Sequence, residues 1–299
     1  MPHVLTFIAQ PGALAPAYLN AARAALTALG ADCDAVIWLA EGEAADLPFS
    51  ALAAEQAIAA VRGALGDAPF DLIAQPAEGR RKKLLLADMD STIVTTETLD
   101  EIAAFAGLKE KIAEITARSM NGELDFKQAL TERVGMLKGL DATALEETWK
   151  TTELMPGARE LVATMRAHGA HTALVSGGFT FFTGRVARLV GFHEHHANTL
   201  LLEAGKLTGQ VGQPILDRDA KLATLKRLAA AHGLALSEAA TIGDGANDLA
   251  MIQAAGLGVA YRAKPSVAAA SRHRIQHGDL RGLLFAQGYR ASDFSVGGK

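Results

Sequence analysis

The chain has 299 residues, of which 49% are apolar, 21% charged and 5% aromatic, a composition typical of globular proteins. Its length predicts two or three domains. The net charge of −4 excludes the basic excess of a nucleic-acid-binding protein, and the single cysteine, Cys33, excludes an internal disulfide framework and a cysteine-rich zinc site.

Targeting and membrane segments are not expected. Residues 1–8 lack the basic start and the long apolar run of a signal peptide. No stretch approaches the ~20 uninterrupted apolar residues that cross a bilayer. We therefore expect a cytoplasmic protein without a membrane partner.

The first 75 residues alternate between strand and helix patterns. Apolar runs predict strands over 4–9, 34–39 and 70–75. Helical spacing predicts helices over 15–29 and 50–65, with Ser50 as the N-cap of the second and Gly30 and Gly66 ending them. The alternation fits a small split βαβ sandwich. Residues 78–83, which are strongly charged, fit a solvated linker better than an anion-binding patch.

The chain beyond residue 83 has the pattern of a doubly wound α/β domain. Short apolar runs predict buried parallel strands, and helical patterns lie between them. The strands are expected over 84–87, 172–176, 239–243 and 256–260, and the helices over 158–168, 220–232 and 248–255. In such a fold, ligands bind at the carboxyl ends of the strands.

Two segments depart from this alternation. Residues 95–155 contain no convincing strand, and insertions after a core strand often act as lids. Helices are expected there over 98–105, 108–120, 125–137 and 143–150. Residues 198–211 predict a hairpin that turns at 203–206, where Gly205 can adopt positive φ.

Two polar motifs follow the first two core strands. Asp88 and Asp90, directly after a strand, can project into one cleft or flank a metal ion, although in isolation a turn with Asp88 as a helix cap is the better explanation. Ser176, followed by Gly177 and Gly178, offers a hydroxyl and backbone N–H groups to an anion. Taken alone, this second motif is more often a tight turn.

Two further motifs follow along the chain. Asp219 is expected to cap a helix, which places Lys221 in its first turn, where a cation opposes the helix dipole. The lysine either serves a group outside the helix or simply faces solvent. Asp244, Asn247 and Asp248 lie in a glycine-flanked loop after a strand, and such hard oxygen ligands suit Mg²⁺. This last motif is the most specific of the four.

In this order the four motifs resemble those of the haloacid dehalogenase-type phosphatase superfamily, and within it most those of the phosphoserine phosphatases. The resemblance covers about residues 84–265 and is strongest over 88–92, 175–179 and 243–248. In the insertion, Glu97 and Arg133 match the subgroup signature. The first 80 residues are similar to the regulatory amino-acid-binding domains that precede some members.

The resemblance implies a fold with three parts. We expect an N-terminal α+β domain of ferredoxin-like, ACT-like type over 1–80, a Rossmann-like catalytic core over 81–94 and 156–299, and a helical cap over 95–155. It also implies Mg²⁺-dependent hydrolysis of O-phospho-L-serine to L-serine and phosphate, the last step of serine biosynthesis. The expected partner is this small substrate, and a homodimer is compatible with the resemblance.

The resemblance also implies roles for the motif residues. Asp88 would attack phosphorus to form an aspartyl phosphate, and Asp90 would act as acid and then base. The metal would bind Asp88, Asp244 and the backbone carbonyl of Asp90, with Asp248 in support. The groups expected to hold the phosphoryl oxygens or orient the site are Lys221, Ser176, the Gly177 N–H and Asn247.

Substrate choice is assigned to the insertion. By the resemblance, Glu97 would match the ammonium of phosphoserine and Arg133 its carboxylate; from position alone, a helix-start acid and a surface arginine fit as well. Met120 and Phe126 are expected to pack the cap rather than to line the pocket. Phosphothreonine or phosphohomoserine remain alternative substrates, and a phospho-accepting amino-acid sensor is the alternative of another class. Asp90 argues against the sensor, because only a hydrolase needs the second acid.

Overall fold

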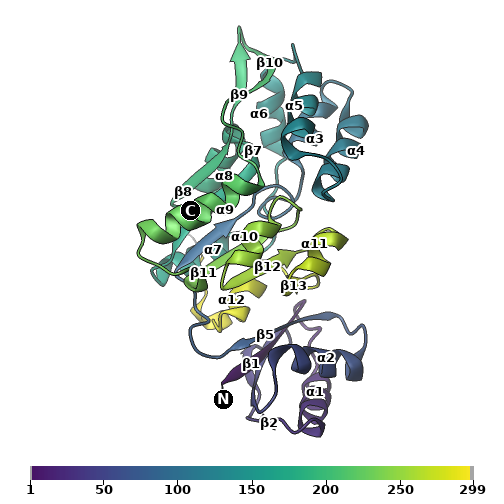
Figure 1. The fold of residues 1–299 in the computed structure, drawn as a ribbon, viewed down its shortest axis with the longest axis vertical. Coiled ribbons are helices and arrows are strands. Elements are labelled where there is room, and N and C mark those ends of the chain that lie inside the picture. The colour runs from purple at the N-terminus through teal and green to yellow at the C-terminus, as the bar shows by residue number, and fades with distance from the viewer. Residues whose placement is uncertain (1, 297–299) are drawn as a thin grey trace.

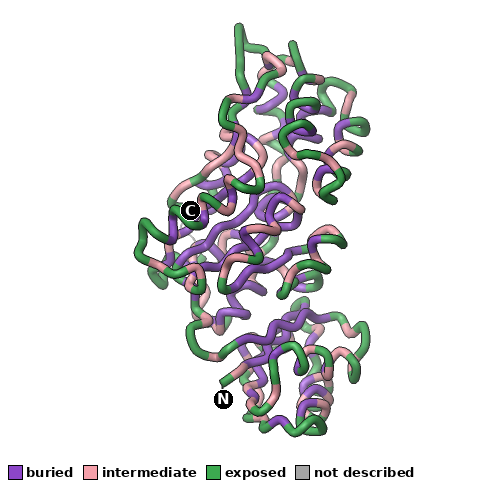
Figure 2. Tube along the Cα trace, viewed as in Figure 1, coloured by how far each residue is buried: buried purple, intermediate pink, exposed green. Residues whose placement is uncertain are grey.

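The computed structural model describes residues 2–296. Figure 1 shows three parts along its longest axis: an N-terminal sheet with two helices at the bottom, a second sheet covered by helices in the middle, and a group of helices at the top. Buried residues follow the strands of both sheets, as Figure 2 shows. No helix among the described residues combines the length and apolarity needed to cross a bilayer.

The N-terminal part is an antiparallel sheet with two helices. Its strands are β1 (His3–Ala9), β2 (Asp32–Cys33), β3 (Ile37–Ala40), β4 (Ala44–Ser50) and β5 (Phe70–Pro76), and its helices are α1 (Pro16–Ala28) and α2 (Ala54–Leu65). The order is β2-β4-β1-β5, and β3 also pairs with β4. Because side chains alternate along a strand, Leu5 and Phe7 pack with the helices, whereas Ile8 belongs to the core of the second sheet.

Strand β4 was not predicted, and the expected N-cap at Ser50 is wrong, because Ser50 is the last residue of β4. Asp46 interrupts the apolar pattern of β4, although this charged residue lies buried in the strand. Thr6 Oγ1 donates to its carboxylate at 2.7 Å and Arg80 Nη2 at 2.6 Å, which offsets the cost of burying the charge. The single strand expected over 34–39 overlaps β3 alone, because β2 ends at Cys33, before that range begins.

The middle part is the predicted parallel sheet. Its strands are β6 (Leu84–Ala87), β7 (His171–Phe179), β8 (Glu194–Asn198), β11 (Ala239–Gly243), β12 (Leu257–Tyr261) and β13 (His273–Ile275). The order is β13-β12-β11-β6-β7-β8, and every pairing is parallel. Along the chain this is the order 3-2-1-4-5-6 of doubly wound nucleotide-binding folds, which have a switch point beside the first strand.

Helices cover both faces of this sheet. They are α7 (Ala158–Ala167), α8 (Thr180–Val190), α9 (Arg218–Ala231), α10 (Leu249–Ala254), α11 (Pro265–Ala270) and α12 (Gly282–Ala286), with short 3-10 turns η1 (Leu236–Glu238) and η2 (Ala291–Asp293). On β6, Leu84 and Leu86 pack toward α9, whereas Leu85 and Ala87 belong to the core on the other face. The expected α/β class with a parallel sheet is therefore confirmed.

Strand β8 and helix α8 were not predicted. The sequence of β8 contains two histidines and a glutamate, and the strand lies at the sheet edge, paired only with β7. An edge strand that is partly exposed needs no apolar run. Strand β13, at the opposite edge of the sheet, was also not predicted, because its three residues are too few to form a recognisable apolar run.

The top part consists of four helices between β6 and α7: α3 (Thr98–Ala104), α4 (Lys109–Met120), α5 (Phe126–Met136) and α6 (Thr143–Thr151). They match the helices predicted from the sequence to within one or two residues. Two backbone bonds close the entry and exit of this segment, Thr95 N to Glu153 O at 3.0 Å and Met155 N to Ile93 O at 2.8 Å.

The predicted hairpin consists of β9 (Leu200–Glu203) and β10 (Lys206–Val211). Its turn places Ala204 at φ 49° and Gly205 at φ 77°, so the expected positive φ at Gly205 is confirmed. The backbone of β10 also meets the helical segment, because Gly139 N donates to Leu207 O at 2.8 Å. The hairpin thus leaves the parallel sheet and lies against α5 and α6 (Figure 1).

Candidate active site

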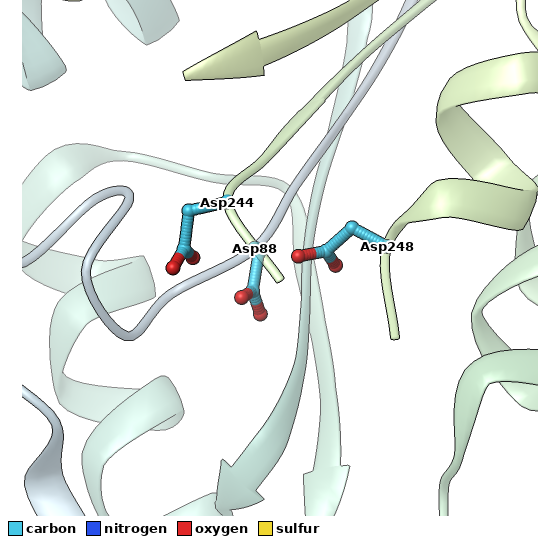
Figure 3. A group of neighbouring side chains, drawn as sticks. All are labelled: Asp88, Asp244 and Asp248. Atoms are coloured by element: carbon cyan, nitrogen blue, oxygen red, sulfur yellow. The ribbon is translucent and has the colours of Figure 1, made fainter. Parts of the chain in front are cut away.

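Polar side chains gather where β6, β7 and β11 end, at the switch point of the parallel sheet. Asp88 follows β6, Ser176 lies near the end of β7, and Asp244 follows β11. Figure 3 shows Asp88 and Asp244 side by side, with Asp248 pointing toward Asp88. Parallel strands place their carboxyl ends at one edge, which is why motifs far apart in the sequence meet here.

The side chain of Lys221 joins Asp88 to Asp248. Its Nζ donates to Asp88 Oδ1 at 2.7 Å and to Asp248 Oδ1 at 2.6 Å, and the side chain is 0% exposed. Burial alone would lower the pKa of Lys221, but the charges of Asp248 and Asp88 raise it above its ordinary value. The lysine therefore stays protonated and offsets part of the negative charge around it.

The helix that carries Lys221 begins earlier than predicted, so Asp219 is not its N-cap. Asp217 is the N-cap, and its Oδ1 accepts from Ala220 N at 2.9 Å. Asp219 lies in the first turn, where an acidic side chain is favoured by the helix dipole. Lys221 N bonds to Asp217 O at 3.0 Å, so the lysine stands at the end of the first turn.

The three carboxylates at the strand ends form a cluster that fits a divalent cation. Asp88, Asp244 and Asp248 each offer an oxygen, and these atoms all lie within 4.8 Å of one another. Burial and then the charge of Asp248 raise the pKa of Asp88 well above its ordinary value. Burial also raises that of Asp244, together with the charges of Glu97 and Asp88. Hard oxygen donors that repel one another are the set that Mg²⁺ binds.

Hydrogen bonds distinguish the three carboxylates. Both oxygens of Asp248 are occupied, Oδ1 by Lys221 and Oδ2 by Gly245 N at 3.0 Å. Asp244 Oδ1 accepts from Thr92 Oγ1 at 3.2 Å. Within residues 2–296, Asp88 Oδ2 and Asp244 Oδ2 accept no hydrogen bond, which leaves these two oxygens available to other groups.

Asp90 faces the other side of the site. Its Oδ1 accepts from Thr98 N at 2.9 Å and its Oδ2 from Ser176 Oγ at 3.1 Å. Ser176 Oγ in turn accepts from Gly178 N at 2.8 Å. Burial raises the pKa of Asp90, and its hydrogen bonds to Thr98 and Ser176 partly oppose that rise. Its carboxyl group is thus held away from the cluster of Asp88 and Asp244.

The two glycines after Ser176 are required by space. A Cβ on Gly178 would lie 2.6 Å from Asp90 Oδ2, and one on Gly177 would lie 2.6 Å from the ring of Phe126. Neither glycine has positive φ. Their role is therefore close approach to neighbouring groups rather than backbone freedom.

Glu97 and Arg133 approach the site from the helical segment. Glu97 Oε1 accepts from Ser91 Oγ at 2.7 Å, and burial, followed by the charge of Asp90, raises the pKa of Glu97 to about 7. Arg133 is 3% exposed. Burial lowers the pKa of its guanidinium, and the charges of Asp100 and Glu97 oppose this effect.

One cavity brings most of the predicted residues together. Its lining includes eight of the ten candidates: Asp88, Asp90, Glu97, Arg133, Ser176, Gly177, Asp244 and Asn247. The other two, Lys221 and Asp248, lie directly behind Asp88. Met120 and Phe126 also line it, so the expectation that they only pack the cap is wrong.

The cavity is small and only partly enclosed. Its free volume is about 30 Å³, which is room for a water molecule. A second cavity of about 250 Å³ lies beside it, and Phe126 and Asn247 line both. Asn247 Oδ1 is buried and has no hydrogen-bond partner in the described part of the chain. Its amide therefore has an acceptor left for a ligand.

Several groups that contact the site residues were not predicted from the sequence. Thr92 contacts Asp244, the Thr98 amide contacts Asp90, and Thr116 contacts Arg133. Thr92 is part of the first motif and could have been noticed there. Backbone amides and a threonine within an ordinary helix carry no sequence signal.

Comparisons with known proteins indicate one family. Residues 85–253 match the model of the haloacid dehalogenase-like hydrolases. The chain is 39% identical to the phosphoserine phosphatase of Streptomyces coelicolor over 270 residues, which are 89% of this chain and 66% of that protein. It is 43% identical to the phosphoserine phosphatase of Lactococcus lactis over 203 residues, which are 68% of this chain and 93% of the relative.

Two solved structures resemble the fold. A haloacid dehalogenase family hydrolase from Salmonella enterica serovar Typhi has a TM-score of 0.81 and 30% identity, covering 95% of this chain and 98% of that one. A structure described as a phospho-aspartyl intermediate analogue of phosphoserine phosphatase has a TM-score of 0.66 and 38% identity, covering 69% and 98%. The chain spans slightly less than two thirds of the Streptomyces relative's length. From its sequence and its fold, the chain belongs to the haloacid dehalogenase-like hydrolase family.

Proposed function

We propose that the chain is a phosphoserine phosphatase, which hydrolyses O-phospho-L-serine to L-serine and phosphate. One observation carries this proposal: a single cavity is lined by Asp88, which Lys221 contacts, and by the acidic Glu97 and the basic Arg133. Asp88 with Lys221 suits a phosphoryl group, and Glu97 with Arg133 suits an amino acid's ammonium and carboxylate. The names of the relatives support the same substrate.

Asp88 is the nucleophile of the proposed reaction. Its Oδ2 has no protein partner among the described residues, so this oxygen can form a bond to phosphorus while the bond from phosphorus to the serine oxygen breaks. Lys221 Nζ, Ser176 Oγ and the Gly177 N–H would hold the phosphoryl oxygens. Burial raises the pKa of Asp88, but Lys221 and a cation bound at the cluster would favour its charged form, and a carboxylate needs no base to activate it.

Asp90 serves both halves of the reaction. Because burial raises its pKa, Asp90 can carry a proton and give it to the departing serine oxygen. The carboxylate that remains then takes a proton from the water that cleaves the aspartyl phosphate. Thr98 N holds this carboxyl group, and Ser176 Oγ also holds it until the serine hydroxyl turns its proton to a phosphoryl oxygen.

The residues of the acidic cluster would hold one Mg²⁺. Asp244, Asp88 through the oxygen that does not attack phosphorus, and the backbone carbonyl of Asp90 would supply the protein ligands. Asp248, occupied by Lys221 and Gly245, would orient the lysine rather than bind the ion. The bound ion supplies positive charge beside the phosphoryl oxygens.

The parts of the chain around the core have proposed roles of their own. Residues 95–155 act as a cap over the site, because α4 and α5 contribute Met120, Phe126 and Arg133 to the lining of the cavity. Residues 1–80 are a regulatory, amino-acid-binding domain of the ACT-like type, for which the split βαβ strand order is the support. The core then comprises residues 81–94 and 156–299.

Phosphate release from O-phospho-L-serine tests the proposed function. We expect turnover with Mg²⁺, none after EDTA, and recovery when Mg²⁺ is restored. Phosphothreonine and phosphohomoserine, assayed in parallel, should be poorer substrates; equal or higher kcat/KM for either would replace phosphoserine as the substrate. Normal turnover by the Asp88→Asn variant would contradict the nucleophile, and a stable phosphoprotein without turnover would favour a sensor.

A further inference from the structure

Three buried polar side chains form a chain of hydrogen bonds across the helical segment. Arg133 Nη1, on α5, donates to Thr116 Oγ1, on α4, at 2.8 Å. Thr116 Oγ1 donates to Asp100 Oδ1, on α3, at 2.6 Å. The three residues are only 3%, 4% and 8% exposed, respectively. Buried polar groups that bond one another in this way fix their own positions.

The hydroxyl of Thr116 stands between opposite charges. Arg133 and Asp100 form no direct ion pair in the described part of the chain, because the threonine hydroxyl accepts from the one and donates to the other. The hydroxyl is also 3.0 Å from Ile112 O, but it has one proton and the shorter contact is to the carboxylate. Thr116 therefore acts as a spacer between a guanidinium and a carboxylate that attract each other.

With Thr116 as the spacer, part of the Arg133 guanidinium stays available to a ligand. Of its five N–H groups, the one on Nε donates to Ala129 O at 3.1 Å and one on Nη1 donates to Thr116. Within residues 2–296, Nη2 of Arg133 donates to no protein group. Arg133 lines the cavity that also holds Asp88, so the donors without a partner are those that a ligand can meet.

We propose that Thr116 is a positioning residue for substrate specificity: its hydroxyl holds Arg133 off Asp100 and thereby presents the guanidinium to the carboxylate of the substrate. The inference rests on the proposed function, because it takes a phosphorylated amino acid as the ligand. Without the hydroxyl, Arg133 would turn to Asp100 and form the direct pair. The substrate carboxylate would then meet a guanidinium that is already paired.

The test compares two substrates that differ by one group, O-phospho-L-serine and phosphoethanolamine, which lacks the carboxylate. Thr116→Val removes the hydroxyl at nearly constant volume. We expect KM for phosphoserine to rise about tenfold or more, since a hydrogen-bonded charge pair is being weakened. We expect kcat for phosphoserine, and kcat/KM for phosphoethanolamine, to stay within about twofold. Thr116→Ser, which restores the hydroxyl, should recover the low KM.

Thr148→Val is the matched control, because Thr148 is also a buried threonine of the helical segment, and its hydroxyl has no hydrogen-bond partner. This variant should leave the preference for phosphoserine unchanged. A preference that survives Thr116→Val, or a loss for both substrates alike, would overturn the spacer role alone. A wild-type protein with no preference for phosphoserine would instead contradict the proposed function, and the inference with it.

Discussion

Lys221 Nζ lies 2.7 Å from Asp88 Oδ1, and the lysine is completely enclosed by protein. The pair is buried at the point where the proposed nucleophile must approach a phosphate group that is itself negative. Lys221 is also bonded to Asp248, so one ammonium serves two carboxylates. Removing it would leave both without their nearest counter-charge.

The Lys221→Met variant should therefore lose activity and stability together. We expect kcat to fall by about 100-fold or more, as for loss of a donor to developing charge, and the free energy of unfolding to fall by about 3 kcal/mol. Lys226→Met, an exposed lysine of the same helix, is the control and should change neither by much. Phosphate release and urea denaturation measure the two effects. Normal turnover by Lys221→Met would remove the lysine from the site.

The Gly178→Ala variant tests whether close approach, rather than flexibility, explains the paired glycines. Its Cβ would lie 2.6 Å from Asp90 Oδ2 and 3.0 Å from Ser176 Oγ. The carboxyl group of Asp90 would have to move, so we expect kcat to drop by about tenfold or more. Gly63→Ala, within α2 and with no atom within 4 Å of the new Cβ, should keep full activity and add about 0.5–1 kcal/mol of stability. An active Gly178→Ala enzyme would show that Asp90 tolerates displacement.

The motifs at the strand ends could be predicted because their geometry follows from topology. Asp88 and Asp244 follow short apolar runs, and parallel strands of one sheet bring such residues to the same edge. The chain of hydrogen bonds from Arg133 through Thr116 to Asp100 could not be predicted. It depends on how three helices pack, and a threonine in a helix of mixed polarity has no sequence pattern that marks it as buried.

The missed elements have a similar cause. Asp46 makes β4 resemble a loop, and only the contacts from Thr6 and Arg80 explain its burial. The polar sequence of β8 suits an edge strand, whose position is fixed by pairing with β7. In both cases the deciding contact joins residues that are distant in the sequence, so local periodicity gives the wrong answer.

Mg²⁺ should stabilise the fold independently of any assay of activity. The acidic cluster repels itself in the absence of a cation, and an ion that binds the folded state alone stabilises it by mass action. At 100 times its Kd, Mg²⁺ should raise the unfolding midpoint by roughly 5 °C. Calorimetry with Mg²⁺ and with EDTA checks this.

The Asp244→Asn variant separates this effect from general salt stabilisation. We expect it to be more stable than the wild type in EDTA, because one repelling charge is gone, and to lose the response to Mg²⁺. Asp67→Asn, an exposed position in the N-terminal part, makes the same charge change and should retain the response. A Mg²⁺ shift that persists in Asp244→Asn would place the cation elsewhere.

Because His273 is buried, we expect the folded protein to lose stability in mild acid. Burial, followed by the charge of Arg272, lowers its pKa to about 4 from 6.5, and its Nδ1 has no hydrogen-bond partner among residues 2–296. Between these two values the unfolded chain binds a proton that the folded chain does not. Stability therefore falls as pH drops from about 6.5 to about 4, by up to about 3 kcal/mol from this residue.

Replacing the imidazole should remove this part of the pH dependence. Urea denaturation of His273→Phe across pH 4 to 7 should give a flatter profile than the wild type, because an apolar ring has no proton to gain. His277→Gln alters an exposed histidine four residues away and should leave the slope as it is. If both variants kept the wild-type slope, other groups would have to account for acid sensitivity, and the neutral state of buried His273 would lose its support.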